Sequence, residues 1–342
     1  MAYISFQPSD FFSTKIYTGD NSATQAQTGV GFQPDFTWIK CRSATEGNTL
    51  TDSVRGATKY LISNTNSVEI TNTDSLKSFD SDGFTVGNAG VTGDSNTYVS
   101  WNWKGGTTTG IAGSPSITPA SYSFNATSGF SVVKWAGTGS AGTLPHGLGV
   151  APKWILVKRL EGSNWICGHD SLGWTKSMIF NEGEGVGTNT RFNDTNPTST
   201  LFSLDGDILV NNTGSTYIAY CFADVKGYSK FGKYWGNGQS SDGTFCFTGF
   251  RPAYVMIKRF ATGNPWVIYD NKRQGYNNNN DELFVNTNSA EVTTDDRFDI
   301  LSNGFKPRSA SQDINGSGEE YIYMSFAESP LVSSNNIPVT AR

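Results

Sequence analysis

One ten-residue pattern occurs three times in this chain of 342 residues, and it constrains the fold more than any other feature. Each copy consists of a glycine, an apolar residue, any residue, a proline, any residue, an aromatic residue, two mostly apolar residues, a β-branched residue and a lysine. The copies span 31–40, 149–158 and 249–258. Because a repeat sets the architecture before single residues can be given roles, the sequence predicts one structural unit built three times.

Further landmarks follow each copy in the same order. An aspartate lies 18 residues after each anchor proline, and a tyrosine opens an alternating strand-like run further on. An aromatic residue two positions before a glycine precedes each anchor, as in Tyr17-Thr-Gly19. These landmarks predict the following organisation: an N-terminal arm 1–10, repeats at 11–105, 128–224 and 225–328, a Gly/Thr/Ser/Pro linker 106–127, and a C-terminal arm 329–342.

The composition favours strands and turns over helices. Aromatic residues make up 13% of the chain, charged residues only 16%, and 38 residues are glycine. Aromatic and β-branched residues build strands, while Gly, Asn, Asp and Ser build turns, and no long run has helical apolar spacing. We therefore expect an all-β fold of three tandem antiparallel β-sandwiches, of jelly-roll or lectin-like type. A β-propeller is disfavoured, because its blades are shorter and three are too few to close a ring.

Several protein classes are disfavoured by what the sequence lacks. The net charge of −5 comes without a Lys/Arg stripe, which argues against nucleic-acid binding. No segment approaches the roughly 20 apolar residues of a membrane helix, and the N-terminus lacks the basic and apolar regions of a secretory signal. We expect synthesis in a cytoplasm. The four cysteines do not recur among the repeats and lack metal-binding spacing, so we expect buried free thiols and no metal or cofactor.

The recurring aspartates Asp52, Asp170 and Asp270 allow two interpretations. They are metal or sugar ligands in a loop of every unit, or they close turns through Asx-type hydrogen bonds. The threefold recurrence favours the structural role, because a structural need repeats with the fold. The two histidines, His146 and His169, have no partners that would make a catalytic triad, and the chain has no GxSxG elbow. We assign no catalytic residue.

Aromatic residues that do not recur are the better candidates for ligand binding. Trp174, Trp235 and Tyr276 lie in or near expected turns, and Trp174 stands 22 residues after its anchor proline, where the other repeats have Gly56 and Gln274. A core aromatic residue would repeat with the core, whereas an exception in a loop is placed to stack on the apolar face of a sugar. Packing between units is the alternative. With Asp170, these three residues form the expected ligand-binding set.

The repeated segments resemble a known family. The resemblance is carried by the segments 32–40, 81–84, 98–104, 146–153, 217–223, 249–252 and 321–327. They are similar to a β-rich repeat family in virion proteins of tailed bacteriophages, many of them marine or cyanobacterial, which are often called tail-fibre or hypothetical proteins. The resemblance covers nearly the whole chain. It implies a structural protein on the exterior of the particle, synthesised in the bacterial host cytoplasm, and it supplies no catalytic residues.

Three functions follow as expectations, in decreasing order of preference. The first is a non-enzymatic tail-fibre or receptor-binding component that contacts a host-surface glycan; by analogy with the family we expect a homo-oligomer, with a trimer favoured. The second is a capsid-decorating or tail adaptor protein that cements virion subunits through the terminal arms. The third is a glycan depolymerase. The chain has no heptad shaft and no separate anchoring domain, which favours a compact tail-tip, fibre-head or decorating subunit.

Overall fold

The computed structural model describes residues 6–273, 277, 280–328, 331–332 and 338–339 and confirms the all-β class. Antiparallel strands dominate these residues, and they contain no α-helix. Two single-turn 3-10 helices are present, η1 (Pro8–Asp10) and η2 (Asp170–Leu172). No helix in this part of the chain is long and apolar enough to cross a membrane.

Unit 1 (11–105) contains two antiparallel sheets. The large sheet has the order β1-β9-β3-β4-β5-β6 and the small sheet the order β2-β8-β7. The strands are β1 (Phe12–Thr18), β2 (Gln25–Thr28), β3 (Phe36–Cys41), β4 (Thr49–Asp52), β5 (Lys59–Ile62), β6 (Ile70–Thr71), β7 (Leu76–Asp80), β8 (Gly83–Val86) and β9 (Thr97–Trp103).

Unit 2 (121–224) has the same plan, with one more strand at an edge of the large sheet and one strand fewer in the small sheet. The large sheet has the order β10-β11-β18-β13-β14-β15-β16, and β12 pairs with β17 in the small sheet. The strands are β10 (Ser121–Asn125), β11 (Phe130–Ala136), β12 (Gly142–Pro145), β13 (Trp154–Arg159), β14 (Ile166–His169), β15 (Lys176–Ile179), β16 (Gly187–Thr188), β17 (Leu201–Leu204) and β18 (Thr216–Phe222).

Unit 3 (225–328) repeats the plan again. The large sheet has the order β19-β26-β21-β22-β23, and the small sheet the order β20-β25-β24. The strands are β19 (Ser229–Trp235), β20 (Cys246–Phe247), β21 (Tyr254–Arg259), β22 (Val267–Asp270), β23 (Leu283–Phe284), β24 (Phe298–Leu301), β25 (Gly304–Pro307) and β26 (Glu320–Phe326). After it, β27 (Leu331–Val332) pairs with β28 (Pro338–Val339).

The sequence landmarks occupy matching places in the three large sheets. The segment after each anchor proline forms β3, β13 or β21, and the run opened by tyrosine forms β9, β18 or β26, which lies in the middle of its sheet. The linker expected at 106–127 is only partly irregular, since it contains β10, which adds to the edge of unit 2 through pairing with β11. The equivalent edges of units 1 and 3, β1 and β19, have no such strand among the described residues.

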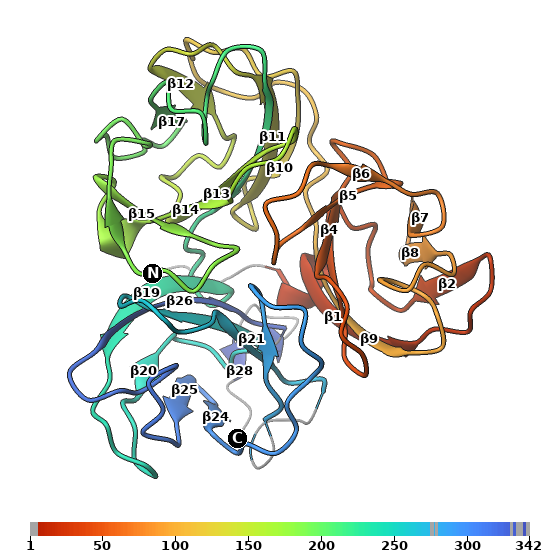
Figure 1. Ribbon diagram of the computed structural model, residues 1–342, viewed down its shortest axis with the longest axis vertical. Helices are drawn as coiled ribbons and strands as arrows, with labels where there is room; N and C mark the ends of the chain where they lie inside the picture. The colour runs from red at the N-terminus through yellow and green to blue at the C-terminus, as the bar shows by residue number, and fades with distance from the viewer. Residues whose placement is uncertain (1–5, 274–276, 278–279, 329–330, 333–337, 340–342) are drawn as a thin grey trace.

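The three units form three lobes around a common centre, with the large sheets facing inward and the small sheets outward (Figure 1). Each small sheet covers a separate apolar core against the outer face of its own large sheet. The inner faces of all three large sheets meet in one shared core. Each large sheet is therefore buried on both faces, which explains why its central strands lack an exposed side.

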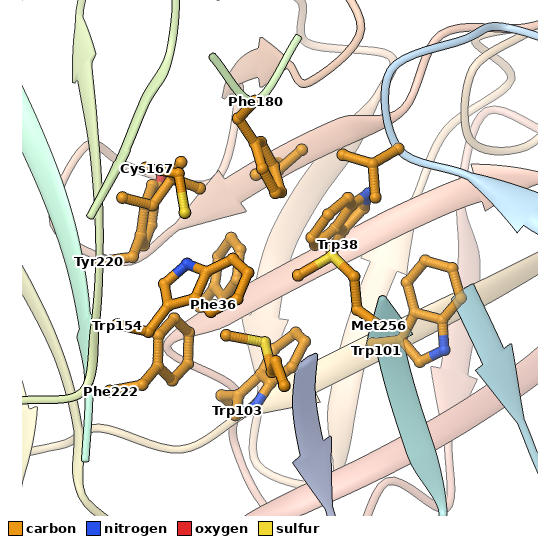
Figure 2. Packing of buried hydrophobic residues seen from close by; sticks show 14 of the residues in the cluster. Phe36, Trp38, Trp101, Trp103, Trp154, Cys167, Phe180, Tyr220, Phe222 and Met256 are labelled. Carbon is orange, nitrogen blue, oxygen red and sulfur yellow. The ribbon is translucent and has the colours of Figure 1, made fainter. Parts of the chain in front are cut away.

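The shared core is rich in aromatic side chains from all three units (Figure 2). Phe36 of unit 1 lies 4.6 Å from Tyr220 of unit 2, and Trp101 of unit 1 lies 5.5 Å from Tyr254 of unit 3, measured between ring centroids. Trp154 of unit 2 is 5.7 Å from Trp266 of unit 3 in the same way. Burying one such side chain stabilises the fold by about 1.5–3 kcal/mol, so the units depend on one another for much of their stability.

Three equivalent backbone hydrogen bonds join the units head to tail. They run from Glu69 N to Leu160 O, from Val186 N to Phe260 O, and from Glu291 N to Arg42 O, each 2.8 Å long. The three acceptors stand eight residues after their anchor prolines. The bonds define three contacts that we call the first seam (units 1 and 2), the second seam (units 3 and 1) and the third seam (units 2 and 3).

In each unit, the aromatic residue of the aromatic-x-Gly landmark stacks on the landmark tyrosine of the paired strand. In unit 1, Tyr17 stacks on Tyr98 in the paired strand, with ring centroids 5.2 Å apart. The Tyr98 hydroxyl donates to the Gly90 carbonyl at 2.7 Å. A Cβ on Gly19 would lie 1.7 Å from the Asp94 carbonyl oxygen, so only glycine fits there. The pairs Trp135–Tyr217 and Tyr234–Tyr321 stack in the same way.

Candidate ligand-binding surface

The recurring aspartates are not all equivalent in the structure. Phe36 pairs with Asp52 and Tyr254 pairs with Asp270, but the equivalent Trp154 pairs with His169 rather than Asp170. The hairpin between β13 and β14 is one residue shorter than its counterparts, which shifts the count from the anchor proline by one. His169 therefore takes the place of the aspartate in unit 2.

At the first seam the aspartate is part of a buried ionic network. The guanidinium Nε of Arg55 donates to Asp52 Oδ2 at 2.6 Å, and both side chains are fully buried. Tyr220 of unit 2 donates its hydroxyl hydrogen to the same carboxylate at 2.7 Å. Arg55 also lies 3.4 Å from Glu69. Asp52 thus stabilises the contact between units and is not available to a ligand.

The second seam has the same construction. Arg273 donates to Asp270 at 2.7 Å and to Glu291 at 2.6 Å. Trp101 of unit 1, which is equivalent to Tyr220, donates its indole hydrogen to Asp270 at 3.1 Å. Arg42 of unit 1 adds a further ion pair with Glu291 at 2.8 Å. The expected structural role of the recurring aspartate is therefore observed at two seams, as an ion pair rather than only as a turn.

The third seam lacks this network. His169 stands there in place of Asp52, and Leu172 in place of Arg55. Val186 replaces Glu69, and Met324 replaces Tyr220. Burial lowers the pKa of His169 to about 4, against a partial opposing effect from the backbone of Tyr323. The imidazole is neutral at pH 7, and its Nδ1 accepts from the Ser171 N–H at 2.9 Å. The third seam therefore has apolar packing and a neutral histidine where the other two seams have a buried ionic network.

The lysine that ends each ten-residue pattern is also structural. Lys40, Lys158 and Lys258 each donate to a backbone carbonyl of the following hairpin, at 2.6, 2.5 and 2.6 Å. Lys158 additionally contacts Asn66 O in unit 1 at 3.3 Å, and Lys258 contacts Gly183 O in unit 2 at 3.1 Å. Burial lowers the pKa of Lys158 to about 7 and of Lys40 and Lys258 to about 8. Lys158 and Lys258 thus bind loops across the first and third seams, whereas Lys40 binds its own hairpin.

The remaining titratable groups considered in the sequence are packed inside. His146 is fully buried, and burial lowers its pKa to about 4. All four cysteines are buried and free, as expected. No group of three or more His, Cys, Asp or Glu residues in the described part of the chain is placed to hold a metal ion.

One of the four expected ligand-binding residues, Trp174, lies where it cannot stack on a ligand. Trp174 is only 3% exposed and packs against Phe192, with ring centroids 5.1 Å apart, in the outer core of unit 2. Its expected role is therefore corrected from ligand stacking to local packing. Asp170 is half exposed and pairs with Lys153 at 2.9 Å, in the same unit as Trp174. Tyr276 lies outside the described residues.

Trp235 is the expected aromatic residue that the structure leaves exposed. It ends β19 and is 56% exposed. Its carbonyl accepts from the Thr244 hydroxyl at 2.6 Å, which brings the strand end beside the segment leading into β20. Phe245 and Phe247 in that segment are 45% and 64% exposed, while Cys246 between them points inward. We call Trp235, Phe245 and Phe247 the unit 3 aromatic surface.

This surface is specific to unit 3. By strand register, Phe247 stands where unit 1 has Thr28 and unit 2 has Pro145. Trp235 ends its strand where β1 ends in Thr18 and β11 ends in Ala136. Sequence reasoning identified Trp235 from its failure to recur, and the same signal was present for Phe245 and Phe247 but was missed.

Cavities adjoin two of the regions described above. One of about 450 Å³ adjoins the unit 3 aromatic surface, because Phe247 lines it together with Asp224, Lys226 and Lys230. The other, of about 690 Å³, lies between unit 1 and β10 and is lined by polar residues around Asp35. Asp35 accepts from the hydroxyls of Ser53 and Ser123, both at 2.7 Å, so it ties the strand β10 to unit 1.

Together, the fold and the exposed aromatic surface define an all-β protein of antiparallel sandwiches joined by one aromatic core. The chain belongs to the family described as "Domain of unknown function (DUF7483)", whose model matches residues 7–330. Comparisons with curated proteins and with solved structures give no match.

Proposed function

We propose that this protein is an exterior structural component of a tailed-bacteriophage particle, of tail-fibre or receptor-binding type, that contacts a host-surface glycan. The resemblance of the repeated segments to phage virion proteins supports the particle. The unit 3 aromatic surface supports the glycan, because exposed aromatic rings with nearby polar groups stack on the apolar faces of sugars. The exposure of this surface carries the proposal: Trp235, Phe245 and Phe247 are 56%, 45% and 64% exposed, so their rings are placed to stack on a ligand.

The packing of the three lobes around one core holds the unit 3 aromatic surface in a fixed position. Unit 3 is joined to both other units through the shared core and two seams, so its surface is held in a defined orientation. We also propose that the protein acts as a homo-oligomer, with a trimer favoured by family analogy. Several copies would multiply a weak single-site affinity into avidity.

A specific observation favours the second candidate, a decorating or adaptor protein. Strands β1 and β19 end their sheets without a partner among the described residues, whereas β11 is covered by β10. An open edge accepts a strand from a neighbouring subunit. In this role the terminal arms attach the protein to the particle, and truncating them would abolish particle incorporation.

The test of the first proposal is binding to host cells. Fluorescently labelled protein is titrated onto candidate host bacteria, and phage adsorption is measured in its presence. Saturable binding with blocked adsorption supports the receptor-binding role. Absence of binding by a correctly oligomeric sample contradicts it and leaves the decorating or adaptor role. Release of reducing sugar from host polysaccharide would instead indicate a depolymerase.

A further inference from the structure

We propose that the cavity between unit 1 and β10 binds a neutral sugar and is a second glycan site of this protein. The inference goes beyond the proposed function, because that function uses the unit 3 aromatic surface and this cavity lies between units 1 and 2. The cavity has a volume of about 690 Å³, within the roughly 300–1,000 Å³ of small-molecule sites, which often lie between domains.

Three segments of the chain form the walls of this cavity. They are the part of unit 1 around Asp35 and Ser53, the residues 104–108 that follow β9, and the start of β10. Thr107 and Phe124 exchange two backbone hydrogen bonds of 3.0 Å, which hold the second wall against the third. Within the first wall, the Ser53 N–H donates to Asp35 O at 2.8 Å. The walls are therefore preorganised, which lowers the cost of binding.

The Asp35 carboxylate is a fixed acceptor in this cavity. Its Oδ1 accepts from the hydroxyls of Ser53 and Ser123, both at 2.7 Å, and its Oδ2 accepts from the Gly105 N–H at 2.9 Å. An ionised carboxylate has about four lone-pair sites, and the described part of the chain fills three of them. Because Asp35 lines the cavity, its fourth site is placed to accept from a ligand hydroxyl.

Lys104 supplies a donor to the same cavity. Its ammonium lies 5.7 Å from the centroid of the Phe11 ring. This cation–π contact orients the ammonium and leaves N–H groups for other acceptors, since an ammonium has three. Asp35 and Lys104 are the two charged side chains of the lining, so the cavity has no net charge.

The edge of β10 adds a backbone donor and a backbone acceptor. Phe124 directs its N–H and C=O away from β11, toward Thr107. Backbone groups alternate along an antiparallel strand, so Tyr122 also directs its N–H and C=O away from β11, and Tyr122 lines the cavity. Thr107 occupies the edge at Phe124, which leaves too short a stretch for an added peptide strand.

This set of groups fits a neutral sugar. Each sugar hydroxyl both donates and accepts, which matches a lining that mixes a carboxylate, an ammonium, hydroxyls and backbone groups. A charged ligand would place a charge in the cavity that one acid and one base together do not balance, and burying an unbalanced charge is costly. Val54 adds an apolar side chain to the lining, which suits the apolar face of a sugar ring.

The test measures binding of the methyl glycosides of glucose, galactose, mannose and N-acetylglucosamine to the full-length protein by saturation-transfer NMR. The methyl glycosides of glucuronate and glucosamine, which carry a charge, are the comparison. We expect a neutral glycoside to bind more tightly than both charged ones. Added salt should change its affinity little, because screening acts on charged ligands.

Two substitutions and one control connect the binding to the cavity. Lys104→Met should weaken the neutral glycoside about tenfold, because it removes a charged hydrogen-bond donor. Ala120→Trp, at an exposed residue of the lining, should abolish binding by filling the cavity. Lys176→Met, at an exposed lysine on β15 of unit 2, should change nothing. Melting temperatures of these variants should match that of the unmodified protein.

The outcomes separate this inference from the proposed function. Failure of every neutral glycoside to bind, tighter binding of a charged one, or undiminished binding by Ala120→Trp overturns the inference. The variant Trp235→Ala/Phe247→Ala should keep its affinity for the glycoside, and loss of that affinity would overturn the inference by placing the sugar on the unit 3 aromatic surface. Host-cell binding by the same variant tests the proposed function alone, so each can fail while the other stands.

Discussion

The first and third seams join equivalent surfaces by opposite means. At the first seam, Asp52 and Arg55 form a buried ion pair that Tyr220 completes from the next unit. At the third seam, Leu172 and Met324 take the positions of Arg55 and Tyr220, and both lie in the shared apolar core. The comparison shows that the shared core dictates the geometry of the contact, while the polarity of the seam varies. A polar residue that recurs in a repeat protein is therefore better interpreted first as part of a contact between the units, and only then as part of a ligand-binding site.

The largest effect is expected from Arg55→Met at the first seam. The substitution leaves Asp52 charged and buried without its partner, which destabilises a protein by about 3–5 kcal/mol. Urea denaturation at pH 7 measures the loss. Lys153→Met is the matched control, because its ion pair with Asp170 is partly exposed and contributes about 0–1 kcal/mol. Equal losses for the two variants would contradict a structural role of the buried pair.

Acid should destabilise the protein through the third seam. The pKa of His169 is about 4 in the folded state and about 6.5 in the unfolded chain. As pH falls from 6.5 to 4, the unfolded state gains a proton that the folded state does not, so stability is lost in that window. Linkage gives about 2 kcal/mol for this histidine between pH 7 and pH 5.

The variant His169→Asn isolates this effect, because its amide does not titrate and offers an acceptor oxygen to the Ser171 N–H. Urea denaturation at pH 7 and pH 5 should show a smaller acid loss for the variant than for the unmodified protein. The remaining loss includes His146, which has the same lowered pKa. An unchanged acid loss would mean that His169 is not buried at the seam.

Giving the first seam the residues of the third seam tests whether the two seams differ only in polarity. The fourfold variant Asp52→His, Arg55→Leu, Glu69→Val and Tyr220→Met gives the first seam the residues of the third seam. Three of these changes are in unit 1, and Tyr220→Met is in unit 2. Replacing a whole buried ionic cluster with apolar side chains is often close to neutral, whereas breaking it is costly. We therefore expect a smaller loss in urea denaturation than Arg55→Met alone causes. A larger loss would show that the two seams differ in shape as well as in polarity.

The smallest effect on stability is expected at the unit 3 aromatic surface. Trp235→Ala removes a side chain that is 56% exposed, and changes at exposed positions usually stay within about 0.5 kcal/mol. Trp174→Ala, in contrast, truncates a buried aromatic residue, which typically costs about 3–5 kcal/mol. Thermal denaturation of the two variants separates them. A large drop for Trp235→Ala would place that residue in a packing role.

The recurrence in the sequence predicted the strands and the all-β class, because core positions must repeat when a fold repeats. It did not predict that the three large sheets share a core, since apolar residues on a strand do not reveal what covers them. Because the β13–β14 hairpin is one residue shorter, counting from the anchor proline matched Asp170 with Asp52. The strand register matches His169 with Asp52 instead. A single sequence gives no means of placing such a deletion within a loop.

Only part of the candidate site was predicted, because the sequence does not show which aromatic residues are covered by other segments of the chain. Trp174 and Trp235 both fail to recur, yet one is buried under Phe192 and the other is open to solvent. The difference depends on long-range contacts: Phe192 closes over Trp174 from a separate loop, while no strand covers β19 in the described part of the chain. Failure to recur therefore selects residues with a local role but does not say whether that role is packing or binding.

The central claim is that the seams are structural and the unit 3 aromatic surface is functional. The most direct test is the binding of labelled protein to host cells, comparing the unmodified chain with Trp235→Ala/Phe247→Ala and with the control Ile208→Ala, an exposed apolar residue of unit 2. We predict that the double variant loses saturable binding while its melting temperature and that of the control stay unchanged, and that the control binds normally. Undiminished binding by the double variant would contradict the claim.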